Sequence, residues 1–365
     1  MADWRVYPLH PWRGFHFGVR GVGVEAGALT GASDTLFGAL CQGVLATQGE
    51  AGASGLTALL AAFTGGNPPF LLSSLFPFAG RTLLLPCPLG LFTGGDKAAR
   101  KVQYLSWDLF AAFVGAPDAA ARQAVFAAAA RLHNGAVWVT AAERPALGLA
   151  FPDPQALDDS VLLWQQGDTP RVTVDRVRNA AQVYQAGSVI FPATAGLYCL
   201  IEWRDAAWQP AIHAALEFLG EDGIGGERSA GYGQFRLDRG VDGRLGTPAP
   251  ELPRRNGPTA AMTLALYHPT PAEAPGLARG WYDLAIRRGW VGAPGALGAR
   301  RKDVLMVTAG AVLPWPDDRL LGEMVDVTPD TWPPGARAVT GVLRYGYALP
   351  LAVPRRAWET PYAAP

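Results

Sequence analysis

The stretch GIGGERSAGYGQF, residues 223–235, holds five glycines in thirteen residues. Helical spacing at about 207–219 precedes it and an apolar strand follows it. A tight turn needs only one or two glycines, and each further glycine costs about 0.5–1 kcal/mol of chain entropy relative to alanine. We therefore expect a second backbone to lie against this stretch, with Arg228, Ser229 and Tyr232 placed to touch it. A plain turn remains the alternative.

A phosphate-binding loop is the other function that a glycine-rich stretch suggests. The lysine of the GxxxxGK[ST] motif is absent, and loops of that class run from strand to helix, whereas this one runs from helix to strand. The C-terminal end of a helix also disfavours an anion by about 0.3–1 kcal/mol. A nucleoside triphosphate site is therefore disfavoured.

Length and charge limit what the chain can bind. Its 365 residues are near the upper size for one hydrophobic core and favour two domains. The 31 basic and 31 acidic residues cancel, so a polyanionic partner must be held by a local patch. Only three of the basic residues are lysines. The rest are arginines, which suit planar contacts with phosphate or base edges, although a GC-rich genome would give the same bias.

Metal, disulfide and membrane signals are weak. Cys41, Cys87 and Cys199 form no CxxC pair, and the histidines lack ligand spacing, so we expect a reducing cytoplasm, no metal and no cofactor. No secretory signal is apparent at the N-terminus. The uncharged run between Glu50 and Arg81 is interrupted by prolines and glycines, which argues against a membrane span.

The pattern along the chain predicts an α+β fold. A strand pair at the start is followed by a helix with Ser33 as its N-cap and one buried stripe from Leu36 to Leu45. A second helix is expected over 117–133 and a third over about 207–219, ended by Gly220. The segments VWV, RVTVDRV, SVIF and GLYCLIEW predict strands.

Two units follow from this order. Strand, helix, strands, helix, strand is the order of a ferredoxin-like (RRM-like) unit, here residues 1–245 with a large insertion at about 95–190. The linker GRLGTPAPELPRRNGP, rich in proline and glycine, separates it from a mostly β second unit at 258–365, which we expect to be a degenerate RRM-like domain.

Five stretches in this order resemble one known family. They read ASDTLFGAL at 32–40, SSLFPF at 73–78, RVTVDRVRN at 171–179, the glycine stretch itself, and RYGYALPL at 344–351. Together they resemble the RAMP superfamily, specifically the Cas-five-like fourth subunit of type III-A (Csm) CRISPR effector complexes. The chain departs from the family in carrying Gly31-Ala32 before Ser33, where a histidine is expected, and in its greater length.

The resemblance implies a non-catalytic, cytoplasmic, RNA-binding scaffold without cofactors or membrane contact. Its partners would be the 5′ repeat handle of the crRNA, the large Cas-ten-type subunit and the next backbone RAMP subunit. A protruding β-hairpin from the insertion would reach the crRNA and that backbone subunit. The implied RNA contacts around the glycine stretch and the first helix are Gly223, Gly225, Gly226, Arg228, Ser229, Gly231, Tyr232, Gly233, His16 and Ser33.

Clusters of basic residues agree with binding of single-stranded RNA, which needs positive groups for phosphates and flat groups for bases. Residues 279–302 carry six basic side chains against Asp283 alone, and we expect RNA contacts from Arg287, Arg288, Arg300, Arg301 and Lys302. Arg171, Arg176 and Arg178 form another cluster, and Lys97, Arg100 and Lys101 a smaller one. Trp281 and Trp290 are candidates for base stacking, although tryptophans among strands more often pack in a core. A solvated surface is the alternative for each basic cluster.

Two rival functions stay open. RAMP relatives that cut precursor crRNA use a histidine as general base, and His16 lies near the first strand, so a crRNA-processing endoribonuclease is one rival. A lone histidine is more often structural. A protein-interaction module without direct RNA contact is the second rival.

Overall fold

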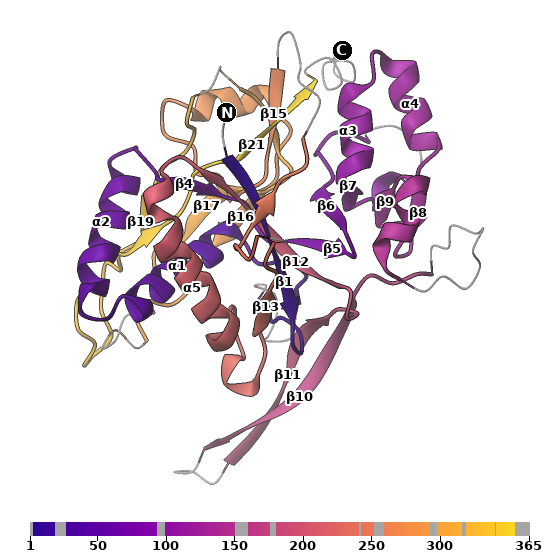
Figure 1. Ribbon diagram of the computed structural model, residues 1–365. Helices are drawn as coiled ribbons and strands as arrows, with labels where there is room; N and C mark the ends of the chain where they lie inside the picture. The colour runs from indigo at the N-terminus through magenta and orange to yellow at the C-terminus, as the bar shows by residue number, and fades with distance from the viewer. Residues whose placement is uncertain are drawn as a thin grey trace.

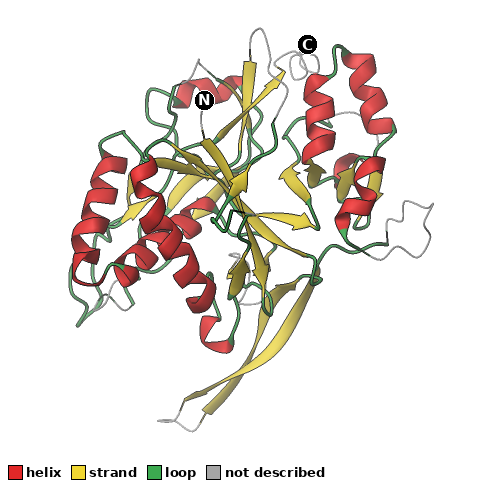
Figure 2. Cartoon of the chain, in the orientation of Figure 1, coloured by secondary structure: helices red, strands yellow, loops and turns green. Residues whose placement is uncertain are grey.

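The computed structural model has an α+β fold, as the sequence predicts (Figures 1 and 2). The described residues are 3–18, 27–92, 99–149, 160–175, 180–240, 242–251, 259–292, 296, 298–315, 319–339 and 341–354. Among them, no helix combines the length and the apolar character that crossing a bilayer requires.

A ten-stranded mixed sheet forms the centre of the molecule (Figure 1). Its order is β13-β1-β12-β5-β6-β7-β9-β8, with β14 beside β1 and β4 beside β12. The neighbours are antiparallel except β7 and β9. The strands are β1 (Asp3–Pro11), β4 (Phe70–Leu72), β5 (Phe76–Ala79), β6 (Thr82–Pro86), β7 (Tyr104–Ser106), β8 (Ala130–Leu132), β9 (Val137–Val139), β12 (Ala195–Trp203), β13 (Phe235–Leu237) and β14 (Thr247–Pro248).

Two helices, α1 (Ser33–Thr47) and α5 (Gln209–Asp222), lie side by side against this sheet (Figure 1). The chain runs β1, α1, β4 and β5, then β12, α5 and β13, while the spatial order is β13-β1-β12-β5. Helix α1 buries Leu36, Phe37, Leu40 and Val44, as the predicted stripe requires, but leaves Leu45 exposed. Helix α2 (Gly52–Thr64) follows α1 and packs against it.

The long segment between β6 and β12 holds two structures. Helices α3 (Trp107–Gly115) and α4 (Ala119–Ala127) pack together beside β7, β8 and β9. The strands β10 (Gln165–Asp175) and β11 (Ala180–Ile190) then form an antiparallel two-stranded ribbon, which extends away from the rest of the chain at the bottom of Figures 1 and 2. The short pair β2 (Phe17–Gly18) and β3 (Gly27–Ala28) lies near it, with β3 packed on β11.

Residues beyond 258 form small sheets and no α-helix in their described part. The strands are β15 (Thr259–Thr263), β16 (Leu284–Arg287), β17 (Val304–Val307), β18 (Val312–Pro314), β19 (Val325–Asp326), β20 (Leu343–Arg344) and β21 (Pro350–Pro354). They pair as β18-β15-β21, β16-β17 and β19-β20. Short 3-10 turns occur at Gly49–Ala51, Ala99–Lys101, Ala141–Leu147, Ala206–Trp208, Arg228–Ala230 and Ala274–Arg279.

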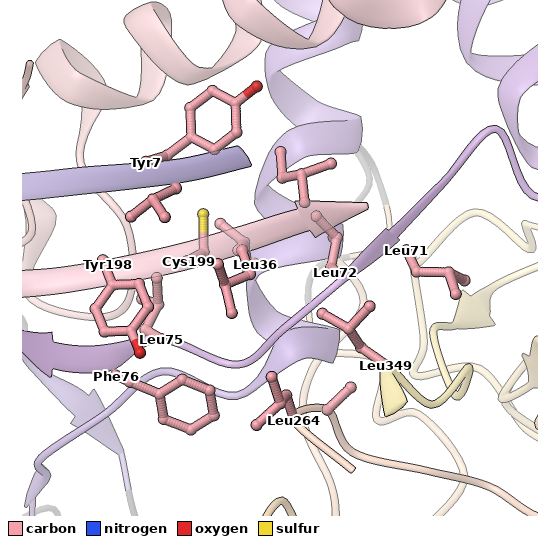
Figure 3. Packing of buried hydrophobic residues seen from close by; sticks show 14 of the residues in the cluster. Tyr7, Leu36, Leu71, Leu72, Leu75, Phe76, Tyr198, Cys199, Leu264 and Leu349 are labelled. Atoms are coloured by element: carbon pink, nitrogen blue, oxygen red, sulfur yellow. The ribbon is translucent and has the colours of Figure 1, made fainter. Parts of the chain in front are cut away.

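One buried cluster joins the N-terminal and C-terminal parts. Figure 3 shows Leu264 and Leu349, which come from the C-terminal part, among Leu36, Leu72 and Phe76. Two buried tyrosines fasten this contact, because the Tyr345 hydroxyl accepts the N–H of Leu72 at 2.9 Å and the Tyr347 hydroxyl donates to the Phe63 carbonyl at 2.6 Å. The two predicted units therefore share one buried cluster.

Helix ends differ from the sequence prediction. Ala32, not Ser33, is the N-cap of α1, and α5 continues past Gly220 to end at Gly223, which has a φ of +86°. The helix expected over 117–133 is shorter, because Asp118 caps its start and the buried residues 130–132 pair with β9 instead. Helices α2 and α3 are additions that the sequence analysis did not predict.

Replacing Gly43 should destabilise the fold. A Cβ at this position of α1 would lie 2.8 Å from the Cβ of Ala215 in α5, so Gly43→Ala should overpack the helix pair and lower stability by about 1–3 kcal/mol. Gly38, also in α1, has no atom within 4 Å of such a Cβ, and Gly38→Ala should instead stabilise by about 0.5–1 kcal/mol. Thermal unfolding midpoints of the two variants measure both effects. Equal midpoints would contradict the close approach of α1 to α5.

Candidate nucleic-acid interface

The glycine loop, residues 223–234, closes on itself between α5 and β13. Gly223 ends the helix, with its N–H bonded to the Leu219 carbonyl at 2.8 Å. The N–H of Ile224 then donates to the Gly233 carbonyl at 3.0 Å and draws the two ends of the loop together. Gly225, Gly231 and Gly233 all have φ values between +81° and +88°, which glycine adopts without strain.

The backbone that lies against this loop is the protein's own. The N–H of Gly226 donates to the His16 carbonyl at 2.9 Å, and the N–H of Gly233 donates to the Gly14 carbonyl at 2.8 Å. A Cβ at Gly225 would lie 2.4 Å from the His16 carbonyl oxygen. The expectation of a second backbone is thus met by residues 14–17.

Most of these glycines pack against the chain itself, while Gly223, Gly225 and Gly226 also line a cleft, so RNA contact at the glycines stays a prediction. A Cβ at Gly233 would lie 2.1 Å from the Ile224 carbonyl oxygen, one at Gly226 2.7 Å from the His16 ring, and one at Gly223 3.0 Å from the Tyr232 carbonyl oxygen. Of the five glycines, only Gly231 has no atom within 4 Å of the position that a Cβ would take. The loop is a packed junction, and its exposed residues are Arg228 and Ser229.

Three other residues predicted to contact RNA are buried in this chain, which disfavours RNA contact there. Tyr232 is 3% exposed, and its hydroxyl lies 3.3 Å from Thr169 Oγ1 while the Arg13 guanidinium covers its ring. His16 is 6% exposed, and its Nδ1 hydrogen-bonds the Gly187 carbonyl. Ser33 is fully buried, and its hydroxyl accepts the N–H of Leu266 at 3.0 Å.

A cleft of about 960 Å³ opens beside the glycine loop, between α1, residues 285–292 and residues 339–344. The glycine loop and much of the basic cluster at 279–302 thus meet around one cavity. Among its described lining residues, Asp34 is the only acidic one. Six arginines line the cleft: Arg228, Arg287, Arg288, Arg300, Arg301 and Arg344.

The floor of the cleft holds a buried ion-pair network. Asp34, 1% exposed at the start of α1, accepts Nε and Nη2 of Arg287 at 3.0 and 2.8 Å and also Nη1 of Arg344. Burial raises the pKa of the Asp34 carboxyl, but Arg287 and then Arg344 outweigh burial, and its pKa lies below the ordinary value. The network ties α1 to β16 and β20.

Several basic residues are already paired, which corrects the prediction of an unopposed positive cluster. Arg287 is held by Asp34, Arg288 by Asp303, and Lys302 by Asp330 at 2.8 Å. Arg228 pairs with Asp222, but both side chains are more than two-fifths exposed. Exposed pairs of this kind contribute little to stability, about 0–1 kcal/mol, so their arginines can exchange a carboxylate for a phosphate.

Arg300 and Arg301 have no carboxylate among the ion pairs of the described residues. The Arg300 guanidinium lies 5.4 Å from the centre of the Trp290 ring, and Arg301 Nε donates to the Trp290 carbonyl at 2.8 Å. Burial, and then the positive charge of Arg344, lower the pKa of Arg301. Both arginines also line a second cavity of about 420 Å³ beside residues 329–333.

The structure does not bring every predicted residue to this cleft. The backbone of Arg171 pairs with Tyr184 in the β10–β11 ribbon, while Arg176 and Arg178 lie outside the described residues, as does Lys97. The base of the ribbon touches the glycine loop through Thr169 and Tyr232. Within the described ranges, no three His, Cys, Asp or Glu side chains gather as metal ligands would.

Sequence reasoning missed Asp34 and Arg344 as partners. Asp34 lies in ASDTLFGAL and Arg344 in RYGYALPL, two of the five stretches that carry the family resemblance, but 310 positions separate them. In the sequence, Asp34 follows the first residue of a helix and Arg344 precedes a buried strand. Nothing in their spacing links the two.

Part of the chain resembles one family of CRISPR proteins. Residues 257–353 match the family model of the CRISPR Csm4 C-terminal domain. The chain is 29% identical over 221 residues to the "CRISPR system Cms protein Csm4" of Thermococcus onnurineus (strain NA1), a match that spans 56% of this chain and 62% of that relative.

Solved structures show the same fold. A chain of the crystal structure of the Csm3-Csm4 subcomplex in the type III-A CRISPR-Cas interference complex matches with a TM-score of 0.66 and 16% identity, over 96% of this chain and 99% of that one. A chain of the Csm1-Csm4 cassette in complex with pppApA matches with a TM-score of 0.50 and 18% identity, over 96% and 98%. The chain thus has the fold of these Csm4 chains. Its residues 257–353 resemble the Csm4 C-terminal domain.

Asp34→Asn should destabilise the protein by about 3–5 kcal/mol, because it leaves Arg344 and Arg287 in a buried site without their counter-charge. Since the folded pKa of Asp34 is depressed, its contribution is complete above the unfolded value of about 3.9 and is lost as the pH falls below it. Urea unfolding measured from pH 7 to pH 3 should show the two proteins converging below about pH 4. Asp222→Asn, in an exposed pair, is the control and should change stability by less than about 1 kcal/mol. If Asp34→Asn changed the free energy of unfolding only slightly and equally at every pH, the ion pairs of Asp34 would not be what holds α1 to β16 and β20.

Gly225→Ala should destabilise more than Gly231→Ala. Both positions have positive φ, which costs an L-residue about 1–2 kcal/mol, but only at Gly225 does the new methyl meet the His16 carbonyl. Thermal unfolding of the two variants isolates this contact. Similar midpoints would show that residues 14–17 do not hold the loop.

Proposed function

We propose that this chain is the non-catalytic crRNA-binding subunit of a type III CRISPR interference complex and holds the 5′ repeat handle of the crRNA in the arginine-lined cleft. The observation that carries the proposal is the cleft itself, where six arginines and one aspartate line a single groove in a chain whose residues 257–353 match the Csm4 C-terminal domain. Arginine suits phosphate because its guanidinium presents several donors in a fixed plane.

The path of the RNA backbone follows from which arginines are free. Arg287 and Arg344 are fixed by Asp34 and shape the floor of the cleft. Arg228, Arg288, Arg300 and Arg301 lie in exposed pairs or without a carboxylate partner among the described ion pairs, and these four are the proposed phosphate contacts. Ser229, exposed beside Arg228, adds a hydroxyl at the glycine-loop end.

The fold supports the same assignment. The antiparallel order β13-β1-β12-β5, with α1 and α5 in the crossovers, is the order of a ferredoxin-like unit, and we assign residues 1–245 to it with an insertion at about 95–190. Residues 258–365 form the degenerate second unit. The β10–β11 ribbon is the proposed protruding hairpin, and Arg171 on it would contact the crRNA beyond the handle.

The partners are proposed by analogy with the relatives. The solved structures pair Csm4 with Csm3 in one case and with Csm1 in the other. We propose that this chain likewise docks the large Cas-ten-type subunit and the adjacent backbone RAMP subunit, in the cytoplasm and in antiviral defence.

Catalysis is not part of the proposal. His16, the residue that the rival endoribonuclease would need as general base, is 6% exposed, has its Nδ1 bonded to Gly187 and lies against Gly226. A general base must reach the proton that it removes, and this ring is enclosed by the loop.

Binding to a fluorescently labelled repeat-handle RNA should depend strongly on salt. Four single-strand phosphate contacts predict a log–log slope of roughly −3, and Arg228→Ala should reduce its magnitude by about 0.7 while leaving the unfolding midpoint near that of the unaltered chain. Arg236→Ala is the matched control, because Arg236 is exposed on β13 and outside the cleft. Fluorescence anisotropy measured from about 50 to about 300 mM salt gives the salt slope of the unaltered chain and of Arg228→Ala.

Two outcomes would replace the proposal. A flat slope with weak binding would favour the protein-interaction module. Metal-independent cleavage of the repeat RNA, lost in His16→Ala, would establish the endoribonuclease instead.

A further inference from the structure

Trp290 is a large aromatic side chain left in solvent at the edge of the cleft. It is 59% exposed and lines the cavity, whereas Trp107, Trp138, Trp164 and Trp203 are at most 5% exposed in the core. Burial of an indole is strongly favourable, so an exposed one that lines a binding cleft indicates a surface that a ligand covers.

The backbone around Trp290 is fixed although its ring is exposed. Trp290 forms a bridge with Arg300, and on either side the N–H of Val291 donates to the Ala299 carbonyl at 2.9 Å and the N–H of Arg301 to the Gly289 carbonyl at 3.0 Å. Little conformational entropy of the main chain is therefore left to lose when a ligand binds. The main chain that carries the ring is fixed before binding.

Positive charge surrounds the ring. The Arg300 guanidinium lies over the indole at 5.4 Å from its centre, and Arg301 is bonded to the Trp290 carbonyl. A cation over one face of an indole leaves the other face for a second flat group. A flat group next to arginines that bind phosphate is the combination that single-stranded nucleic acid requires.

We propose that Trp290 and Arg300 form a stacking platform for one unpaired nucleobase of the RNA strand bound in the cleft. The proposal rests on the proposed RNA-binding function and adds to it a base-binding site of named residues. Every nucleobase has a π-face, so the platform accepts any base and contributes affinity rather than sequence specificity. Arg301, next along the chain, is placed for the phosphate that follows this base.

Two other tryptophans, Trp281 and Trp12, do not fit this role. Trp281 is half-buried against the core, and a Cβ at Gly90 would lie 2.4 Å from its ring. Trp12 is 69% exposed but lies at the end of β1, where its N–H bonds Gln234, and it is not among the residues lining the cleft. A protein segment is the competing occupant of the platform, and the excess of arginine over aspartate in the cleft favours a polyanion instead.

The test compares two labelled probes with the full chain. One is an oligoadenylate of about ten nucleotides, and the other is an abasic ribose-phosphate oligomer of the same length and charge. Trp290→Ala should weaken binding of the oligoadenylate about tenfold, leave binding of the abasic oligomer unchanged, and leave the salt slope of both unchanged, because stacking releases no counterions. Trp290→Phe should restore most of the affinity, and Trp12→Ala, the exposed control, should bind both probes as the unaltered chain does.

Each contrary result has its own meaning. If the unaltered chain binds the oligoadenylate but Trp290→Ala binds it equally well, or weakens both probes alike, the platform is wrong and the RNA-binding function stands. If the unaltered chain binds neither probe, nor the repeat-handle RNA, both proposals fail. If Trp290→Ala instead abolishes only association with a partner subunit, the ring is a protein contact and the base-stacking proposal is overturned.

Discussion

The Asp34 carboxylate determines how the two parts of the chain meet. It lies buried at the start of α1, where the helix dipole already favours a negative charge, and it binds one arginine from β16 and one from β20. A buried charge is tolerated only when its partners satisfy it, so the position of the C-terminal part relative to α1 is constrained to the geometry that keeps all three groups paired. The walls of the cleft are these same elements, and the width of the cleft depends on this network.

The glycine loop applies a similar constraint at the other end of the cleft. Its hydrogen bonds to Gly14 and His16 fix it to the segment after β1, and that segment in turn bridges Val189 at the base of the β10–β11 ribbon. Arg228 therefore projects from a junction of helix, sheet and ribbon and not from a free loop. In the proposed function the glycines act indirectly, because they let three main-chain segments approach closely enough to hold one arginine at the cleft.

Local patterns in the sequence predicted many of the strands and helices, though not α2 and α3, and long-range pairing explains why the charged site was misjudged. The strands at 137–139, 195–203 and 235–237 and the buried face of α1 follow from periodicity. The sequence predicted a positive cluster without opposing charge because the partners of its basic residues lie elsewhere in the chain. Asp34, which pairs with Arg287, is 253 positions away, and Asp330, which pairs with Lys302, is outside residues 279–302. The glycine loop was correctly expected to face another backbone, but sequence carries no signal that residues 14–17, rather than a ligand, provide it.

The balance of charge then limits how the cleft attracts its ligand. With a formal net charge of zero, the chain has no overall field that would draw the proposed RNA ligand from a distance, and at about 0.15 M salt the local field of the arginines is screened within about 8 Å. Affinity must therefore arise at contact, from a few phosphates and from interactions that salt does not weaken. The exposed indole of Trp290, beside arginines that have no carboxylate partner among the described ion pairs, would supply that second kind of contact in the proposed complex, and in a neutral protein its share of the binding free energy would be correspondingly large.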